Sequence, residues 1–127
     1  MWTYHCYDDA KSPNLWERWY RANRAAQGAH DATFRIIEQQ EIWGRPNVKA
    51  LGKGLIEVKF KGADRLQWRV FGFYTPGKRQ DFTVTAIGYH KDEAYTPREV
   101  MELARRRKAE IETGDAKACP CERPARA

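Results

Sequence analysis

Residues 49–61 read Lys-Ala-Leu-Gly-Lys-Gly-Leu-Ile-Glu-Val-Lys-Phe-Lys, and the second half of this stretch alternates apolar with polar side chains. Ile56, Val58 and Phe60 fall on one face of a strand, and Glu57 falls with lysines on the other. Two further strand patterns follow at 66–74 and 82–89, separated by turn residues. Short turns join antiparallel neighbours, so these residues predict a three-stranded antiparallel sheet.

Two helices are expected before this sheet. Ser12-Pro13 is typical of a helix start, and an apolar stripe from 15 to 26 then recurs at helical spacing up to Gly28. Asp31 is expected to cap a second helix that ends before Gly44-Arg45-Pro46. A short connection between two helices predicts an antiparallel hairpin, whose aromatic stripe belongs to the core. The side chains of the two helices that are expected to pack on the sheet are Trp16, Trp19, Phe34 and Ile37.

The ends of the chain complete the predicted order. Residues 2–7 alternate as a strand does, and Thr96-Pro97 is typical of the start of a helix that carries Arg105-Arg106-Arg107-Lys108 and ends at Gly114. The resulting order, β-α-α-β-β-β-α, predicts an α+β fold of two layers, in which the helical hairpin packs on a mainly antiparallel sheet. Residues 1–114 are expected to form this domain, and residues 115–127 a disordered tail.

Composition favours a polyanionic partner. The chain has 127 residues and a net charge of +6, and basic surfaces gain from counterion release on nucleic acid. The alternative is an ordinary solvated surface. No apolar run is long enough to span a bilayer and no signal pattern opens the chain, so a cytoplasmic localisation without membrane contact is expected.

The three cysteines do not indicate a disulfide scaffold or a metal site. Cys6 lies in an apolar alternation and is most simply a small buried hydrophobe. Cys119 and Cys121 lie in the Pro-, Ala- and Arg-rich tail, where two thiolates would provide only half of a zinc shell. We therefore expect no metal ligands and no cofactor.

Several motifs, taken in order, carry a resemblance to a known family. Lys49-x-Leu51-Gly-x-Gly54-Leu55-x-Glu57, then Arg69-Val-Phe, Tyr89-x-Lys91 and Thr96-Pro97-Arg98-Glu99 resemble the phage-derived HigB-like branch of the RelE/ParE type II toxin superfamily. The resemblance covers residues 2–112 and implies a RelE-like fold with a curved sheet. Related toxins enter the ribosomal A site and cut mRNA without a metal, and a partner antitoxin, often a small helix-turn-helix protein, blocks them.

The resemblance also implies a catalytic site. Arg69 would stabilise the charged transition state, Lys59 and Lys91 match further cations, and His90 is suited to proton transfer. Tyr95 matches a tyrosine that stacks on or orients the scissile nucleotide, with Tyr89 as its competitor. A basic surface would hold the RNA through its phosphates. The residues assigned to that surface are Lys49, Lys53, Lys61, Tyr89, Arg105 and Arg106.

Two departures from the family pattern leave catalytic competence open. Glu57 stands where the most active ribosome-dependent relatives carry a second lysine, although this branch often has Glu there. Asp92 stands where many members of the branch carry a second lysine, and both residues remove positive charge from the expected centre. Arg69 could instead be a structural arginine paired with Glu57, and Lys59, Lys61 and His90 could be ordinary solvated residues. Two other functions therefore stay open, namely a non-catalytic module that binds nucleic acid or a host protein, and inhibition of a host enzyme such as gyrase.

Overall fold

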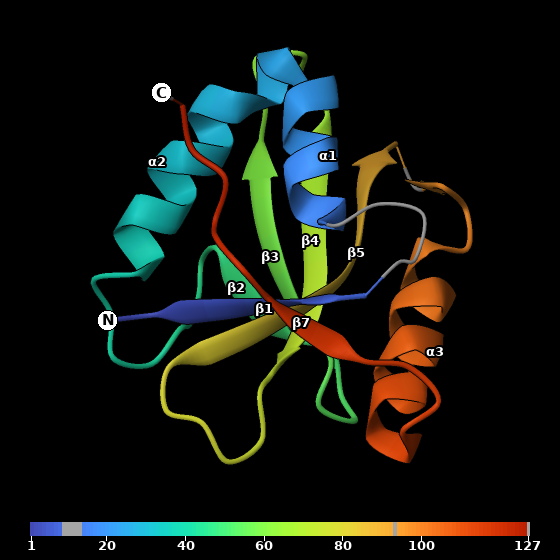
Figure 1. Cartoon of the computed structure of the whole chain (residues 1–127). Coiled ribbons are helices and arrows are strands. Elements are labelled where there is room, and N and C mark those ends of the chain that lie inside the picture. Colours follow the sequence, from blue (N-terminus) through green and yellow to red (C-terminus); the bar gives the residue numbers. More distant parts are fainter. Residues whose placement is uncertain (9–13, 93, 127) are drawn as a thin grey trace.

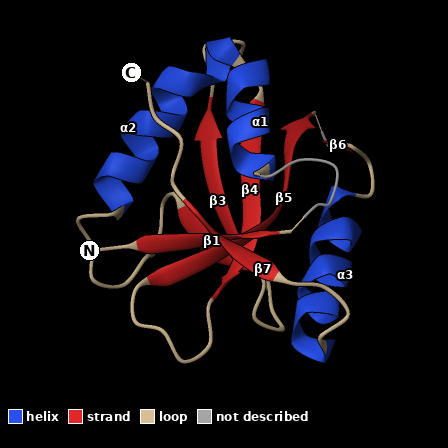
Figure 2. Cartoon of the chain, in the orientation of Figure 1, coloured by secondary structure: helices blue, strands red, loops and turns tan. Residues whose placement is uncertain are grey.

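The computed structural model describes residues 1–8, 14–92 and 94–126, and it has the predicted α+β architecture. Figures 1 and 2 show a curved sheet with α1 and α2 in front of it and α3 at its side. The elements are β1 (Thr3–Tyr7), α1 (Leu15–Ala22), a 3-10 helix (Arg24–Ala26), α2 (Gln27–Ile37), β2 (Val48–Ala50), β3 (Ile56–Lys61), β4 (Gln67–Tyr74), β5 (Asp81–Lys91), β6 (Ala94–Thr96), α3 (Val100–Thr113) and β7 (Ala118–Cys121).

The sheet contains the three predicted antiparallel strands at its centre. Its order is β2-β3-β4-β5-β1-β7, and β6 pairs with β5. The first strand, β1, runs parallel to β5, and all the other pairs are antiparallel. The short strands β2 and β6 were not predicted because each has only three residues, too few for an alternation to be visible.

The helical hairpin covers one face of the sheet, as predicted. Trp16, Phe34 and Ile37 are almost fully buried, and they belong to one apolar cluster with the inward side chains of β1, β3, β4 and β5. The ring of Trp19 is half-buried and lies edge-on against Trp68, with 5.2 Å between the ring centroids. The predicted packing of the aromatic stripe on the sheet is therefore confirmed.

The helix ends differ from those expected. Asn14 caps α1, since its side chain accepts hydrogen bonds from the backbone N–H groups of Trp16 and Glu17. The expected start at 12–13 lies outside the described residues. Gly28 and Asp31, predicted as a helix end and a helix cap, are both inside α2 because a 3-10 turn leads directly into that helix.

The last helix begins later than expected and covers part of the other face. Thr96 is in β6, paired with Tyr89, and α3 begins only at Val100. Val100 and Ala104 pack on the opposite face of the sheet in a second apolar cluster with Leu55, Phe71 and Ala86. Beyond this cluster the second face is not covered by α3. None of the described helices is long and apolar enough to cross a membrane.

The expectation of a disordered C-terminal tail is wrong. Residues 118–121 form β7, which pairs with β1, and Cys121 forms a disulfide with Cys6. Cys6 is therefore not simply a small buried hydrophobe. The tail has no apolar period because a pairing partner 115 residues away, and not a local pattern, orders it. Disulfides are rare in reducing cytosol, so this pair gives no support to the expected cytoplasmic localisation.

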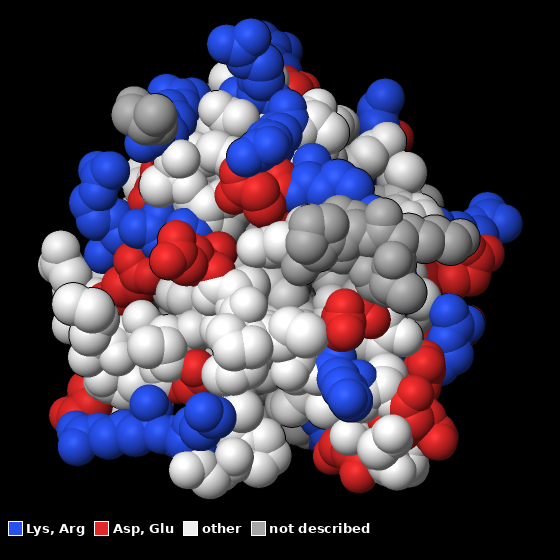
Figure 3. Space-filling view, in the orientation of Figure 1, with Lys and Arg blue, Asp and Glu red and all other residues white. Residues whose placement is uncertain are grey.

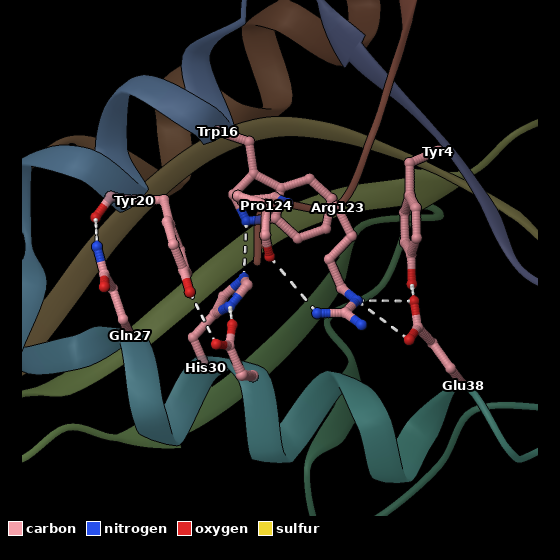
Figure 4. A network of polar contacts seen from close by, with 9 residues as sticks. Tyr4, Trp16, Tyr20, Gln27, His30, Glu38, Arg123 and Pro124 are labelled. Carbon is pink, nitrogen blue, oxygen red and sulfur yellow. Dashed lines mark hydrogen bonds and ion pairs between the residues drawn. The ribbon is translucent and has the colours of Figure 1, made fainter. Parts of the chain in front are cut away.

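A chain of polar contacts ties the C-terminal segment to the hairpin (Figure 4). The guanidinium of Arg123 donates to both carboxylate oxygens of Glu38, at 3.0 and 3.1 Å, and the Tyr4 hydroxyl donates to the same carboxylate. These three residues come from β1, the end of α2 and the segment after β7. The contact therefore holds the last residues of the chain over the hairpin.

A second group of contacts fixes the protonation of His30 (Figure 4). Its Nε2 accepts from the indole N–H of Trp16 at 3.1 Å, so its proton is on Nδ1 and is donated to Asp31 at 2.9 Å. Burial lowers the pKa of His30 to about 4. Burial alone would raise the pKa of Asp31, but hydrogen bonds from His30 and Tyr20 outweigh it and lower that pKa.

The disulfide gives a first prediction. In a Cys119→Ala background, which removes the remaining free thiol, Cys121→Ala should lower the free energy of unfolding by roughly 2–5 kcal/mol, because the Cys6–Cys121 bond closes a loop of most of the chain. Urea denaturation without reductant measures this. Cys119→Ala alone is the control and should change stability by less than about 0.5 kcal/mol. Equal stability of the two variants would contradict the pairing.

The buried imidazole gives a second prediction. Between pH 6.5 and about 4 the unfolded chain binds a proton at His30 that the folded chain does not bind, so stability should fall as the pH falls through this window. The contribution of Asp31, whose pKa is lowered, is lost only at still lower pH. Thermal unfolding across this range should show the slope in the native chain and a flatter one in His30→Gln. An unchanged slope in the variant would show that His30 is not its source.

Candidate functional site

Four of the five predicted catalytic residues lie on one face of the sheet. Strand register places Lys59 opposite Arg69, and it places Gln67 opposite His90, which is itself opposite Tyr95. Residues directly opposite each other point to the same side, so β3, β4, β5 and β6 each contribute one predicted side chain to this face. It is the face that the hairpin does not cover. We call this group of Lys59, Arg69, His90 and Tyr95 the sheet site.

Arg69 is held at the centre of the sheet site by Glu57. Its Nε lies 3.4 Å from the Glu57 carboxylate, and the two side chains are only 12% and 6% exposed. The other guanidinium nitrogens donate to the backbone carbonyl of Trp68 at 3.1 Å and to the side-chain oxygen of Gln67 at 3.3 Å. The ion pair that the sequence analysis kept as an alternative is therefore present, and it fixes the orientation of the guanidinium.

Tyr95 connects the ion pair to His90. Its hydroxyl is close enough to Glu57 for that carboxylate to raise its pKa, and its ring lies 4.9 Å from the imidazole of His90, centroid to centroid. Burial raises the pKa of Tyr95, and the negative charge of Glu57 raises it further, against the opposing effect of Arg69. The phenol therefore remains protonated at neutral pH and acts as a hydrogen-bond donor.

Gly88 allows this arrangement. It lies opposite Arg69 in β5, where a Cβ would be 2.7 Å from the carbonyl oxygen of Thr96 and 2.9 Å from the side chain of Val100. Any other residue would push β6 and the start of α3 away from β5. The close approach of β6 is what brings Tyr95 beside His90.

Lys91 and Tyr89 do not join the sheet site. Tyr89 lies opposite Trp68, with their rings 5.1 Å apart, on the face covered by the hairpin. The strand continues to Lys91, which therefore alternates with His90 and falls on the same face as Tyr89. Lys91 was expected in the same site as His90, but this is wrong because β5 continues two residues past its predicted end at 89, so the two side chains alternate across the sheet.

The residues expected to bind RNA divide into two groups. Lys49 lies opposite Glu57 and Lys61 opposite Gln67, so both are on the face of the sheet site, and Lys53 is exposed in the loop after β2. Arg105 instead donates to the carbonyls of residues 51 and 52 and attaches that loop to α3. Arg106 is exposed and pairs with a glutamate one turn later, at 3.6 Å.

The rest of the basic run on α3 is used inside the protein. Arg107 donates to the carbonyl of Thr85 at 2.8 Å and lies over the ring of Tyr7. The side chain of Lys108 is 16% exposed, pairs with Glu112 at 3.0 Å and lies over Phe73. Most of the run 105–108 is therefore not a solvated helix face.

The sequence pattern does not reveal the parts played by Gln67 and Gly88. Gln67 holds one side of the Arg69 guanidinium, and only the pairing between strands shows this. Across the described residues, no three His, Cys, Asp or Glu side chains are grouped as a metal site would need.

The comparison with protein families agrees with this fold. A family model described as phage derived protein Gp49-like (DUF891) matches residues 19–109, which is well over half of the chain. The protein belongs to this phage-derived Gp49-like family, a family of RelE/HigB-like toxins. Searches of curated proteins and of solved structures found no significant match.

The buried ion pair gives a third prediction, tested by a double-mutant cycle. Glu57→Gln or Arg69→Gln alone leaves a buried charge unpaired and should cost on the order of 3–5 kcal/mol of stability. The double variant should cost less than the sum, with a coupling of about 1–3 kcal/mol. Chemical denaturation of the four proteins measures it.

The matched control for this cycle is the exposed pair Arg79–Glu41. Its atoms are 2.8 Å apart, but its side chains are 80% and 73% exposed. The same glutamine changes there should show a coupling below about 1 kcal/mol. Equal couplings in the two cycles would mean that burial does not strengthen the Glu57–Arg69 pair.

Proposed function

We propose that this protein is the toxin of a type II toxin–antitoxin system and that it cleaves mRNA on the ribosome without a metal ion. The observation that carries this proposal is the sheet site, where two cations, an imidazole and a phenol from four strands share an uncovered face. Membership of the Gp49-like toxin family supports the toxin role. The HigB-like branch, the cytoplasm as the place of action and a small helix-turn-helix antitoxin are parts of the same proposal.

The proposed chemistry needs only the side chains of the sheet site. His90 accepts the proton of the ribose 2′-hydroxyl, whose oxygen attacks the adjacent phosphorus while the bond to the 5′-oxygen breaks. The leaving 5′-oxygen takes up a proton from water, and Tyr95, which stays protonated, donates a hydrogen bond toward that oxygen or orients the nucleotide beside it. Arg69 and Lys59 stabilise the negative charge that builds up on the phosphate.

Glu57 has two opposed effects in this scheme. It fixes the guanidinium through Nε, and it leaves the nitrogen now bound to Gln67 as the one a phosphate can take over. Its negative charge, however, offsets much of the positive charge of Arg69. Lys59, opposite Arg69 in the sheet, then supplies the remaining positive charge, so we propose that the two cations act together.

The same ion pair favours a second candidate function. An arginine already paired with a buried carboxylate can serve a module that binds nucleic acid or a host protein such as gyrase without cleaving RNA. The two candidates differ in one product, because only the nuclease creates new 5′ ends in mRNA.

The fourth prediction separates these candidates. After inducible expression, mRNA 5′ ends mapped in vivo should show new cleavage sites, and Arg69→Lys should reduce cleavage by about 10²–10³-fold. Lysine keeps the charge beside Glu57, so the protein should fold, but an ammonium cannot reproduce the planar fork of the guanidinium. Arg79→Lys, on an exposed arginine elsewhere, should leave cleavage unchanged.

Two outcomes would go against the nuclease. Growth inhibition without new 5′ ends would favour the binding module. Full cleavage by folded Arg69→Lys and Arg69→Ala proteins would show that the sheet site is not the catalytic centre.

A further inference from the structure

A cavity of about 690 Å³ lies on the hairpin side of the molecule, between the end of α1, the start of α2 and the last residues of the chain. Three of its seven lining residues are arginines. The lining is Glu17, Tyr20, Arg21, Arg24, Gln27, Ala125 and Arg126. We call it the arginine pocket. Its volume is in the usual range of ligand sites, about 300–1,000 Å³.

The charge of the arginine pocket is positive and only partly compensated. Among the described residues, Glu17 is the only acidic one that lines the pocket, and it already pairs with Arg21 at 2.9 Å. Within the described ranges, Arg24 and Arg126 form no ion pair, and both are exposed. Two guanidinium groups are therefore available to an anion that enters the pocket.

The position of Arg126 depends on the ordered C-terminal segment. The pairing of β7, the Cys6–Cys121 disulfide and the Arg123–Glu38 ion pair hold this segment over the hairpin. The backbone of Arg126 is close enough to Asp31 to lower the pKa of that carboxyl, and its guanidinium lies against Gly28, where a Cβ would be 3.3 Å away. The pocket thus combines residues that are about a hundred positions apart in the sequence.

The arginine pocket lies at the same end of the molecule as the sheet site. The backbone N–H of Ala63, in the turn from β3 to β4, donates to the carbonyl of Ala25 at 3.1 Å. Arg24 is next to that contact on the hairpin side, while Lys61 and the exposed Arg65 belong to the turn region. Figure 1 shows this end at the top, and Figure 3 shows Lys and Arg gathered there over α1.

We propose that the arginine pocket binds the phosphate backbone of RNA, and that Lys61 and Arg65 continue this contact around the end of the molecule to the sheet site. The choice of RNA as the polyanion rests on the proposed function. A strand that follows this path would be held on two faces, and its register on the sheet site would be set partly from the pocket.

The chemistry of the pocket favours a nucleic acid over an acidic protein. The guanidinium fork matches phosphate oxygens, and no Leu, Ile, Val, Met or Phe lines the pocket. Protein interfaces are built around an apolar core, which is missing here. The Tyr20 hydroxyl is already bonded to Asp31, at 2.7 Å, and the ring is buried, so base stacking is also excluded at this residue. The contact is therefore independent of base sequence.

The test compares two double variants, each with two cations replaced by neutral glutamine, by their binding to a short 2′-O-methyl oligouridylate. This RNA lacks the attacking hydroxyl, so binding is measured without cleavage. Arg24→Gln/Arg126→Gln should weaken binding and reduce the slope of log K against log salt by about 1.4, the value for two lost phosphate contacts on a single strand. Lys78→Gln/Arg79→Gln removes the same charge at the opposite end, in the turn before β5, and should change the slope little.

Each outcome decides the proposal. A loss confined to the Arg24/Arg126 pair supports it, whether or not the protein cleaves mRNA, so failure of the nuclease proposal is seen separately in the 5′-end mapping. Equal losses in both double variants would show diffuse electrostatic attraction and overturn it. Binding of polyglutamate, but not of RNA, that depends on Arg24 and Arg126 would also overturn it, in favour of a protein partner.

Discussion

The parallel pairing of β1 with β5 is the constraint on which the rest of the structure depends. It is held at its start by Asp81, which is 2% exposed and accepts hydrogen bonds from His5, Thr3 and Thr75. Burial alone would raise the pKa of Asp81, but these hydrogen bonds outweigh it and lower that pKa. Because no tight turn can join parallel strands, the chain must leave the sheet after β1 and return through the hairpin and three further strands. The hairpin therefore lies on one face and buries its aromatic side chains there.

Because the hairpin covers one face of the sheet, the side chains of the sheet site are within reach of a ligand on the opposite face. With one face closed by α1 and α2, Glu57, Lys59, Arg69 and His90 lie on the other face, and α3 covers only the part around Phe71 and Ala86. The uncovered part contains the sheet site. The same β1 leaves its outer edge free for β7, which brings the C-terminal residues across the hairpin and adds Arg126 to the arginine pocket.

The sequence was sufficient for the features that depend on local pattern. Alternation in 55–61 and a short turn placed Lys59 and Arg69 together correctly, and the aromatic stripe identified the covered face. The sequence did not predict features that depend on where a strand ends or on a pairing partner far away in the chain. Two extra residues in β5 moved Lys91 to the other face, and the pairing of β7 with β1 left no periodic signal in a segment rich in proline and alanine. Glu57 was visible as a departure from the family pattern, but its contact with Tyr95 required β6.

The surface available to a polyanion in the structure differs from the one that the sequence suggests. From the sequence, the basic run of α3 was the obvious surface, yet Arg105, Arg107 and Lys108 bind carbonyls, a glutamate and aromatic rings of the same chain. Most of the exposed positive charge behind the net charge of +6 therefore lies on parts of the surface other than α3. The lysines of the sheet face and the arginines around the end of α1 are among the cations that are exposed to solvent, and the contact between Ala63 and Ala25 joins these two regions at one end. A phosphate backbone drawn to that end would reach the sheet site with Glu57 already holding Arg69 in place.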